Sequence, residues 1–315
     1  MRTRAGPYLI LLVLGMGWGL SVPLSKIAVS TGYQPFGLIF WQLVIVVAVL
    51  GGFSAMRRKP LVFGRQYWRL FIMVALCGAV LPDIFFYMSA ARLPGGVMAI
   101  VISSVPMFSL PIALMLGTET FAWRRVLGLG LGLLGILLLV VPEASLPERA
   151  MVAFVPLALL APVLYATEGN LVAKWGTQGL DSVQTLVSAS LLGAIITLPL
   201  ALATGQWINP LARFGVPEAA LVASAILHGC VYAGYVWLVG RAGSVFAAQT
   251  AYLVTGFGVI WSLVLLNESY SPYIWAALAV MLAGVFIVQP RIGKVLAPAS
   301  PIGEDGENAG RNGPR

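Results

Sequence analysis

Residues 93–118 read LPGGVMAIVISSVPMFSLPIALMLGT and contain no charged side chain. About 20 consecutive apolar residues are enough to cross a bilayer as a helix, so this run is long enough to span a membrane. Residues 182–212, 242–267 and 269–290 are further uncharged runs. These stretches predict an all-α integral membrane protein rather than a soluble domain.

The composition of the whole chain supports the same fold class. Its 315 residues are 59% hydrophobic and 10% charged, with a mean hydropathy of +0.93, whereas soluble domains carry about 25% charged residues. This composition excludes a soluble enzyme, a nucleic-acid-binding domain and a disordered protein. The two cysteines, Cys77 and Cys230, are too few for a disulfide framework or a metal site of their own. We therefore expect no metal and no cofactor.

Apolar runs separated by short segments predict ten transmembrane helices. Short connections favour antiparallel neighbours. Residues 291–315 are rich in Pro, Gly and charged side chains, which predicts a disordered tail. The predicted spans are 8–28, 36–55, 69–89, 94–116, 125–141, 152–173, 183–203, 217–239, 243–266 and 270–289.

The distribution of basic residues predicts the orientation of these spans. If the N-terminus lies inside, 15 of the 19 Lys and Arg residues fall in inside segments and 3 in outside segments, with Lys26 near the outer end of the first span. Basic residues collect on the cytoplasmic side of membrane proteins. We therefore expect the N-terminus, the C-terminus and the tail to be cytoplasmic.

The sequence also repeats internally. Because each half holds five spans, an odd number, the second half is expected to enter the bilayer in the opposite sense. The predicted units are a first repeat over 1–148, an inverted second repeat over 149–290 and the tail. A shift of 149 residues places Glu119 on Glu268, Arg92 on Arg241 and Gly135 on Gly284, and a shift of 147 places Trp18 on Tyr165 and Gly32 on Gly179.

Several short motifs recur in a characteristic order. They are Gly17-Trp18-Gly19 followed by Pro23 and Lys26, then Pro106, a Gly-Thr-Glu ending at Glu119, the glycines 128, 130, 132 and 135, Asn-Glu at 267–268 and Ala-Gly at 283–284. The chain thereby resembles the drug/metabolite transporter superfamily, in its ten-span branch with two EamA-type repeats. The second half departs from this pattern at 165–173, where Ala173 stands in the register of Lys26.

The resemblance implies a carrier of the bacterial inner membrane, often an exporter of amino acids, nucleobases, other metabolites or drugs. It also implies a cavity lined by the first, third and fourth helices of each half, with the fifth helix peripheral. Substrate identity varies widely within such a family and does not transfer to this chain.

Two acids inside predicted spans are candidates for proton coupling. Asp83 shares a helix face with Tyr87, and Glu168 follows Tyr165 by about one turn. Intramembrane acids are rare and are usually functional. Asp83 could couple protons or bind a substrate amine, or it could hydrogen-bond a neighbouring helix. Glu168 could carry protons, or it could pair with a cation such as Lys26.

Other polar residues admit two interpretations each. Lys26 could face the cavity or reach the headgroups, and His228 could relay protons or bond another helix. Glu119 and Glu268 are expected to be structural, capping a helix or fixing a turn. The predicted substrate cavity comprises Trp18, Lys26, Asp83, Tyr87, Ser104, Pro106, Tyr165, Glu168, His228, Tyr232, Gln249 and Tyr252, with Asp83, Glu168 and His228 as the proton-coupling candidates.

These patterns favour a secondary transporter over two other classes of membrane protein. We expect alternating access, a small-molecule substrate, the lipid bilayer as surroundings, proton exchange as an option, and no nucleic-acid partner. The chain could act as a monomer or a homodimer. The alternatives are a membrane-embedded enzyme acting on lipid-linked substrates, which would gather several polar residues at one interface, and a channel-like facilitator.

Overall fold

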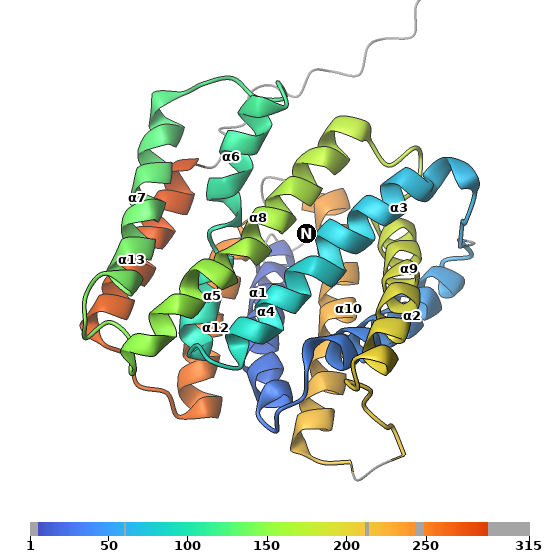
Figure 1. Cartoon of the computed structure of the whole chain (residues 1–315). Helices are drawn as coiled ribbons and strands as arrows, with labels where there is room; N and C mark the ends of the chain where they lie inside the picture. Colours follow the sequence, from blue (N-terminus) through green and yellow to red (C-terminus); the bar gives the residue numbers. More distant parts are fainter. Residues whose placement is uncertain (1–5, 60, 212–213, 243–248, 289–315) are drawn as a thin grey trace, which may run out of the picture.

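The computed structural model describes residues 6–59, 61–211, 214–242 and 249–288, and within them it contains helices and turns but no strand (Figure 1). The first repeat holds α1 (Gly6–Val29), α2 (Pro35–Met56), α3 (Trp68–Ala75), the π-helical turn η2 (Leu76–Val80), α4 (Leu81–Ala90), α5 (Gly95–Ile102), α6 (Val105–Met115) and α7 (Trp123–Val140). The second holds α8 (Phe154–Trp175), α9 (Ser182–Ala203), α10 (Val216–Ala242), α12 (Thr250–Leu266) and α13 (Pro272–Val288). Two short 3-10 turns, η1 (Arg65–Tyr67) and η3 (Arg149–Ala153), precede α3 and α8.

These helices confirm the all-helical fold with ten spans in two repeats. The third span is the continuous run of α3, η2 and α4, and the fourth is α5 and α6, broken at Ser103 and Ser104. The ninth predicted span starts at 243, but residues 243–248 lie outside the described part, as does the predicted tail at 291–315. Among described residues, eight helical runs are long and apolar enough to cross a membrane, and α12 and most of α13 form two shorter apolar helices.

Many large apolar side chains are exposed on the outside of the bundle. Leu9, Met115 and Trp123 are 63%, 87% and 74% exposed. Large apolar side chains at such exposure would be a liability in water. The surface therefore fits a multi-pass membrane protein.

Two contacts made from opposite ends of α2 distinguish the two ends of the bundle. Near the start of α2, Trp41 Nε1 donates to Ile208 O at 2.9 Å. Just beyond the end of α2, Lys59 Nζ bonds Asp181 Oδ2 at 2.7 Å. Between Trp41 and Met56, the last residue of α2, the helix rises about 22 Å, because each residue adds about 1.5 Å. Residues near 58 and near 208 are thus at opposite ends, as the predicted threading requires.

The first helix of each repeat packs against the third and fourth spans of the other repeat. The first helix of the first repeat, α1, packs on α10 and α12, and its counterpart α8 packs on α4, α5 and α6. Helix α2 packs on α9, and the fifth helices α7 and α13 pack on each other at the side of the bundle (Figure 1). The last contact needs glycine, since a Cβ on Gly284 would lie 2.8 Å from the carbonyl oxygen of Gly128. This arrangement leaves the first, third and fourth spans of each repeat around a shared centre.

Candidate functional site

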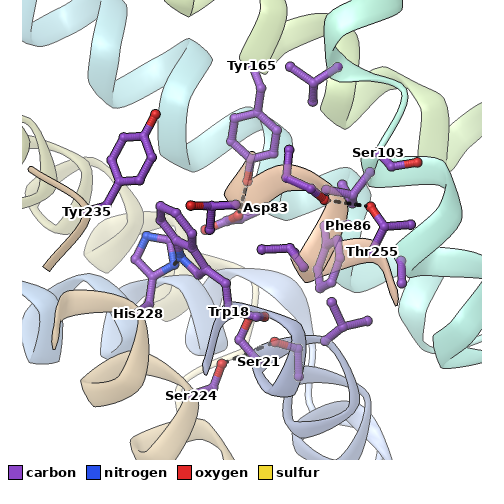
Figure 2. A pocket seen from close by; sticks show the side chains of 18 of the residues that line it. Trp18, Ser21, Asp83, Phe86, Ser103, Tyr165, Ser224, His228, Tyr235 and Thr255 are labelled. Atoms are coloured by element: carbon purple, nitrogen blue, oxygen red, sulfur yellow. Dashed lines mark hydrogen bonds between the residues drawn. The ribbon is translucent and has the colours of Figure 1, made fainter. Parts of the chain in front are cut away.

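A cavity of about 580 Å³ lies between the repeats, in the size range of small-molecule sites (Figure 2). Its walls come from α1, α2, α4, α5, α6, α8, α10 and α12, together with the break between α5 and α6. The lining is Trp18, Ser21, Val22, Ser25, Gln42, Asp83, Phe86, Tyr87, Ala99, Ile102, Ser103, Val105, Pro106, Tyr165, Glu168, Ser224, His228, Tyr235, Thr250, Ala251, Val254 and Thr255.

Asp83 lies at the centre of a hydrogen-bonded group drawn from both repeats. Its carboxylate accepts a hydrogen bond from Gln42 Nε2 at 2.8 Å and one from the Tyr165 hydroxyl at 2.9 Å, one on each oxygen. The Tyr87 hydroxyl donates in turn to Gln42 Oε1. Asp83 is 7% exposed and Tyr87 is 2% exposed. This buried group satisfies the carboxylate and joins α2 and α4 to α8.

Glu168 lines the same cavity in a different setting. It is half-buried, and the described part of the chain offers its carboxylate no hydrogen bond and no ion pair. Its stem lies against Gly78 of the π-helical turn, where a Cβ would come within 3.1 Å of Glu168 Cγ. Single π-helical turns inside α-helices often mark functional sites. The glycine leaves the room that the Glu168 side chain occupies.

Aromatic rings form one wall of the cavity. Trp18 Nε1 donates to His228 Nδ1 at 3.2 Å, and the Trp18 ring lies 5.4 Å from that of Tyr235, tilted by 53°. Since Nδ1 accepts this bond, a neutral His228 carries its hydrogen on Nε2, a tautomer assigned from the hydrogen-bond network. Trp18 and Tyr165, which the 147-residue shift superposes, thus each bond a group of the other repeat.

Backbone carbonyls engage several hydroxyl groups of the lining. Ser21 Oγ donates to Trp18 O at 2.6 Å, Ser103 Oγ to Ile100 O at 2.7 Å, and Thr255 Oγ1 to Ala251 O at 2.9 Å. A fourth pair links α1 to α10, where the hydroxyls of Ser25 and Ser224 are 3.4 Å apart. Where the hydroxyl hydrogen points at a carbonyl, the oxygen lone pairs remain for other partners.

Lys26 and Glu268 connect helices where α4 ends and α5 begins rather than in the cavity. Lys26 Nζ donates to the carbonyls of Ala90 at 2.9 Å and Leu93 at 2.6 Å, where α4 ends. A cation at a helix C-terminus is favourable because free carbonyls and the helix dipole both attract it. Glu268 accepts from the backbone N–H of Gly95 at 2.8 Å and thereby caps α5 of the other repeat.

The second structural candidate, Glu119, makes a local contact. It forms an ion pair with Arg125, Oε2 to Nη1 at 2.8 Å, on the first turn of α7. This pair spans six positions within one repeat. The two glutamates that the repeat superposes therefore differ in partner, because Glu268 reaches across the repeats.

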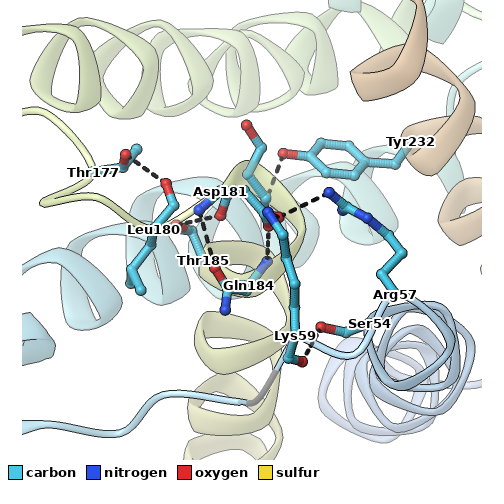
Figure 3. Close-up of polar contacts among 10 residues, drawn as sticks. Ser54, Arg57, Lys59, Thr177, Leu180, Asp181, Gln184, Thr185 and Tyr232 are labelled. Carbon is cyan, nitrogen blue, oxygen red and sulfur yellow. Dashed lines mark hydrogen bonds and ion pairs between the residues drawn. The ribbon is translucent and has the colours of Figure 1, made fainter. Parts of the chain in front are cut away.

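The end of the bundle where α2 ends and α9 begins holds a cluster of charged groups around Asp181 (Figure 3). Asp181 caps α9 by accepting from the backbone N–H of Gln184 at 2.8 Å, and Lys59 and Arg57 reach it from the end of α2 at 2.7 and 3.2 Å. Burial acts to raise the pKa of Asp181, but the hydrogen bond from Lys59, the cap from Gln184 and the Arg57 charge together hold that pKa below its ordinary value. The cluster ties α2 to α9.

The structure gathers seven of the twelve predicted cavity residues: Trp18, Asp83, Tyr87, Pro106, Tyr165, Glu168 and His228. It places the other five outside the lining. Lys26 bonds the end of α4, and Ser104 is fully buried and bonds Val101 O. Tyr232 points to Ser182 O at 3.5 Å. Gln249 is exposed at the start of α12, and the buried Tyr252 hydroxyl has no partner among the described residues.

Gln42 is the most informative residue absent from the sequence-based prediction. It is the amide that links Asp83 to Tyr87, and it comes from the second span, which the resemblance does not place at the cavity. The sequence does contain an indication of this role, because Gln42 is an isolated amide in the apolar run 36–55. Polar groups within membrane spans tend to be functional. Ser21, Ser25, Ser224 and Thr250 are further lining residues that were not predicted.

Comparison with known proteins gives a consistent family. The chain matches the EamA-like transporter family twice, over residues 6–141 and 153–289. It is 32% identical over 132 residues to Protein PecM of Dickeya dadantii (strain 3937), a match covering 40% of this chain and 43% of that protein. A solved crystal structure matches its fold with a TM-score of 0.62 at 16% identity, covering 90% of this chain and 96% of the other.

Proposed function

The chain belongs to the EamA-like transporter family, and we propose that it is a secondary carrier that exports small organic molecules across the bacterial inner membrane by alternating access. One observation carries the proposal: both repeats contribute polar side chains to the same cavity between them. Carriers built from repeats hold their substrate at such an interface and move one repeat against the other around it.

If the repeats move against each other, some of the hydrogen bonds that join them must break. At the outer end, Glu268 of the second repeat holds the N-terminus of α5, and the Tyr270 hydroxyl accepts a hydrogen bond from Gly96 N at 3.0 Å. We propose that these contacts part when the cavity opens outward. We also propose that Lys59 and Asp181 lie at the cytoplasmic end, which places the N-terminus inside. The proposed boundary between the two repeats falls between residues 148 and 149.

Proton exchange is the proposed driving reaction. Asp83 and Glu168 both face the cavity, and a carboxyl group changes charge when it gains or loses a proton. A carrier coupled in this way would take up a proton from one side and release it on the other as the repeats alternate. His228, in the same lining, is a third group that can change charge.

Transport into inverted membrane vesicles tests the carrier and its coupling. We expect saturable, proton-driven uptake, with counterflow of unlabelled solute accelerating the labelled one. Asp83→Asn and Glu168→Gln should each reduce proton-driven uptake at least tenfold, because neither amide can take up a proton at physiological pH. The control is Glu119→Gln, whose ion pair lies outside the cavity.

The outcomes separate the possible functions. If both variants transport with the pH dependence of the unmodified chain, proton coupling through these acids is wrong. If flux does not saturate and shows no counterflow, the protein is a channel-like facilitator rather than a carrier. A covalently altered solute recovered from the vesicles would instead indicate an enzyme.

A further inference from the structure

We infer that the cavity takes an organic cation with an apolar, ring-bearing body, and that Glu168 is its counter-ion. This inference rests on the proposed carrier function and names the class of solute for the same cavity. It separates amines from amino acids, whose carboxylate this cavity does not accommodate.

The charged side chains in the described lining of the cavity are acidic. The described residues around the cavity include two carboxyl groups, Asp83 and Glu168, and neither a lysine nor an arginine. Lys26 is the basic residue within the first span, and its ammonium group is held by the carbonyls of Ala90 and Leu93. When these acids are ionised, an anionic solute would therefore meet negative charge without a compensating cation.

The two carboxylates are not equally available to a ligand. Both oxygens of Asp83 already accept hydrogen bonds, from Gln42 and Tyr165. Glu168 has no partner in the described part of the chain, although it lines a cavity inside the membrane. An unpaired carboxylate is unfavourable there, and a cation would supply the missing partner.

Hydrogen-bond donors in the lining are mostly engaged as well. Ser21, Ser103 and Thr255 direct their hydroxyl hydrogens to backbone carbonyls, which leaves oxygen lone pairs toward the cavity. An ammonium group carries several N–H donors and suits this surface. A carboxylate needs donors, and here it would find neutral groups such as His228 Nε2.

The remaining wall accounts for the apolar part of the solute. Trp18, Phe86 and Tyr235 lie in the lining, and the Trp18 ring is 5.4 Å from the Tyr235 ring (Figure 2). Aromatic faces attract cations, most strongly where water is excluded, and they also pack against rings. A cation bound at Glu168 could therefore rest its body against this wall.

A matched set of four compounds tests the inference: phenethylammonium, phenethyl alcohol, 3-phenylpropanoate and phenylalanine, which share a phenyl ring and differ in charge. Each is titrated against the purified full chain in detergent, and the rise in melting temperature with concentration yields Kd. We expect phenethylammonium to bind at least tenfold more tightly than the alcohol. The propanoate and phenylalanine should bind more weakly than the alcohol.

Two variants decide which carboxylate is responsible. Glu168→Gln should bring the ratio of the two Kd values, alcohol over cation, close to one, while the alcohol still binds and so reports an intact cavity. Glu119→Gln should keep the ratio. The inference is overturned if phenylalanine or the propanoate binds as tightly as the cation, if Glu168→Gln keeps the preference, or if none of the four compounds binds.

Counterflow with the same compounds separates this inference from the proposed function. If phenylalanine rather than the cation is bound and exchanged, the protein is a carrier but the assigned solute class is wrong. If the cation binds through Glu168 but shows no counterflow, the binding assignment is supported and the carrier function fails.

Discussion

Asp83 and Glu168 are two acids in one cavity with opposite surroundings. Asp83 is buried and accepts hydrogen bonds from side chains of two other helices, whereas Glu168 is half-buried and has no partner among the described residues. Glu168 also stands where the 147-residue repeat places Ser21, so the second repeat presents a carboxylate where the first presents a hydroxyl. The comparison indicates that Asp83, besides its proposed part in proton exchange, holds helices together, and that Glu168 is free for a ligand.

The largest expected difference is in the free energy of unfolding when each carboxylate is removed in turn. Asp83→Ala should lower the free energy of unfolding by about 1–3 kcal/mol, because Gln42 and Tyr165 would be left with buried donors that lack an acceptor. Glu168→Ala removes no protein contact of its carboxylate, so we expect a change of less than about 0.5 kcal/mol. Unfolding by titrated denaturing detergent, followed by circular dichroism, measures both values. Equal losses in the two variants would show that the proposed division of roles is wrong.

A pair of tyrosines sharpens the comparison with a smaller effect. The Tyr165 hydroxyl donates to Asp83, while the buried Tyr252 hydroxyl has no partner in the described structure. Tyr165→Phe should therefore destabilise the fold by about 0.5–1.5 kcal/mol, and Tyr252→Phe should be neutral or slightly stabilising. Thermal unfolding of the two variants beside the unmodified chain measures the difference. A larger loss for Tyr252→Phe would contradict the hydrogen-bonding pattern.

Asp181 offers a reference carboxylate outside the membrane, with the smallest expected effect. Its pKa is held below the ordinary 3.8, so its ionised form stabilises the folded state. That contribution is complete above pH 3.8 and is lost as the pH falls through the lower pKa of the folded state. Asp181→Asn should melt at a temperature that depends less on pH below about pH 4. Melting curves recorded below and above pH 4 test this prediction. If the melting temperatures of the variant and of the unmodified chain change with pH in parallel, the ionised Asp181 carboxylate does not have the proposed stabilising role.

The two ends of the bundle also show that matching positions in the two repeats can make different contacts. Glu119 and Glu268 occupy matching places in the repeats, yet Glu119 pairs with Arg125 in its own repeat and Glu268 caps α5 of the other. Lys26 has no counterpart in the second repeat, where Ala173 stands in its register. The fold is thus nearly symmetric in its helix pairings and asymmetric in its polar contacts.

The sequence by itself determined the ten spans, the two repeats and the presence of acids within the membrane. Length of apolar run, distribution of charge and the repeat shift carry that information directly. Only the tertiary structure decided that Asp83 is satisfied and Glu168 is not, that Gln42 enters the site, and that Lys26 leaves it. The physical reason is that lipid-facing and protein-facing sides of a membrane helix are both apolar, so hydropathy does not reveal which side faces the cavity. Partners such as Gln42 and Tyr165 meet Asp83 only because helices distant in sequence pack together.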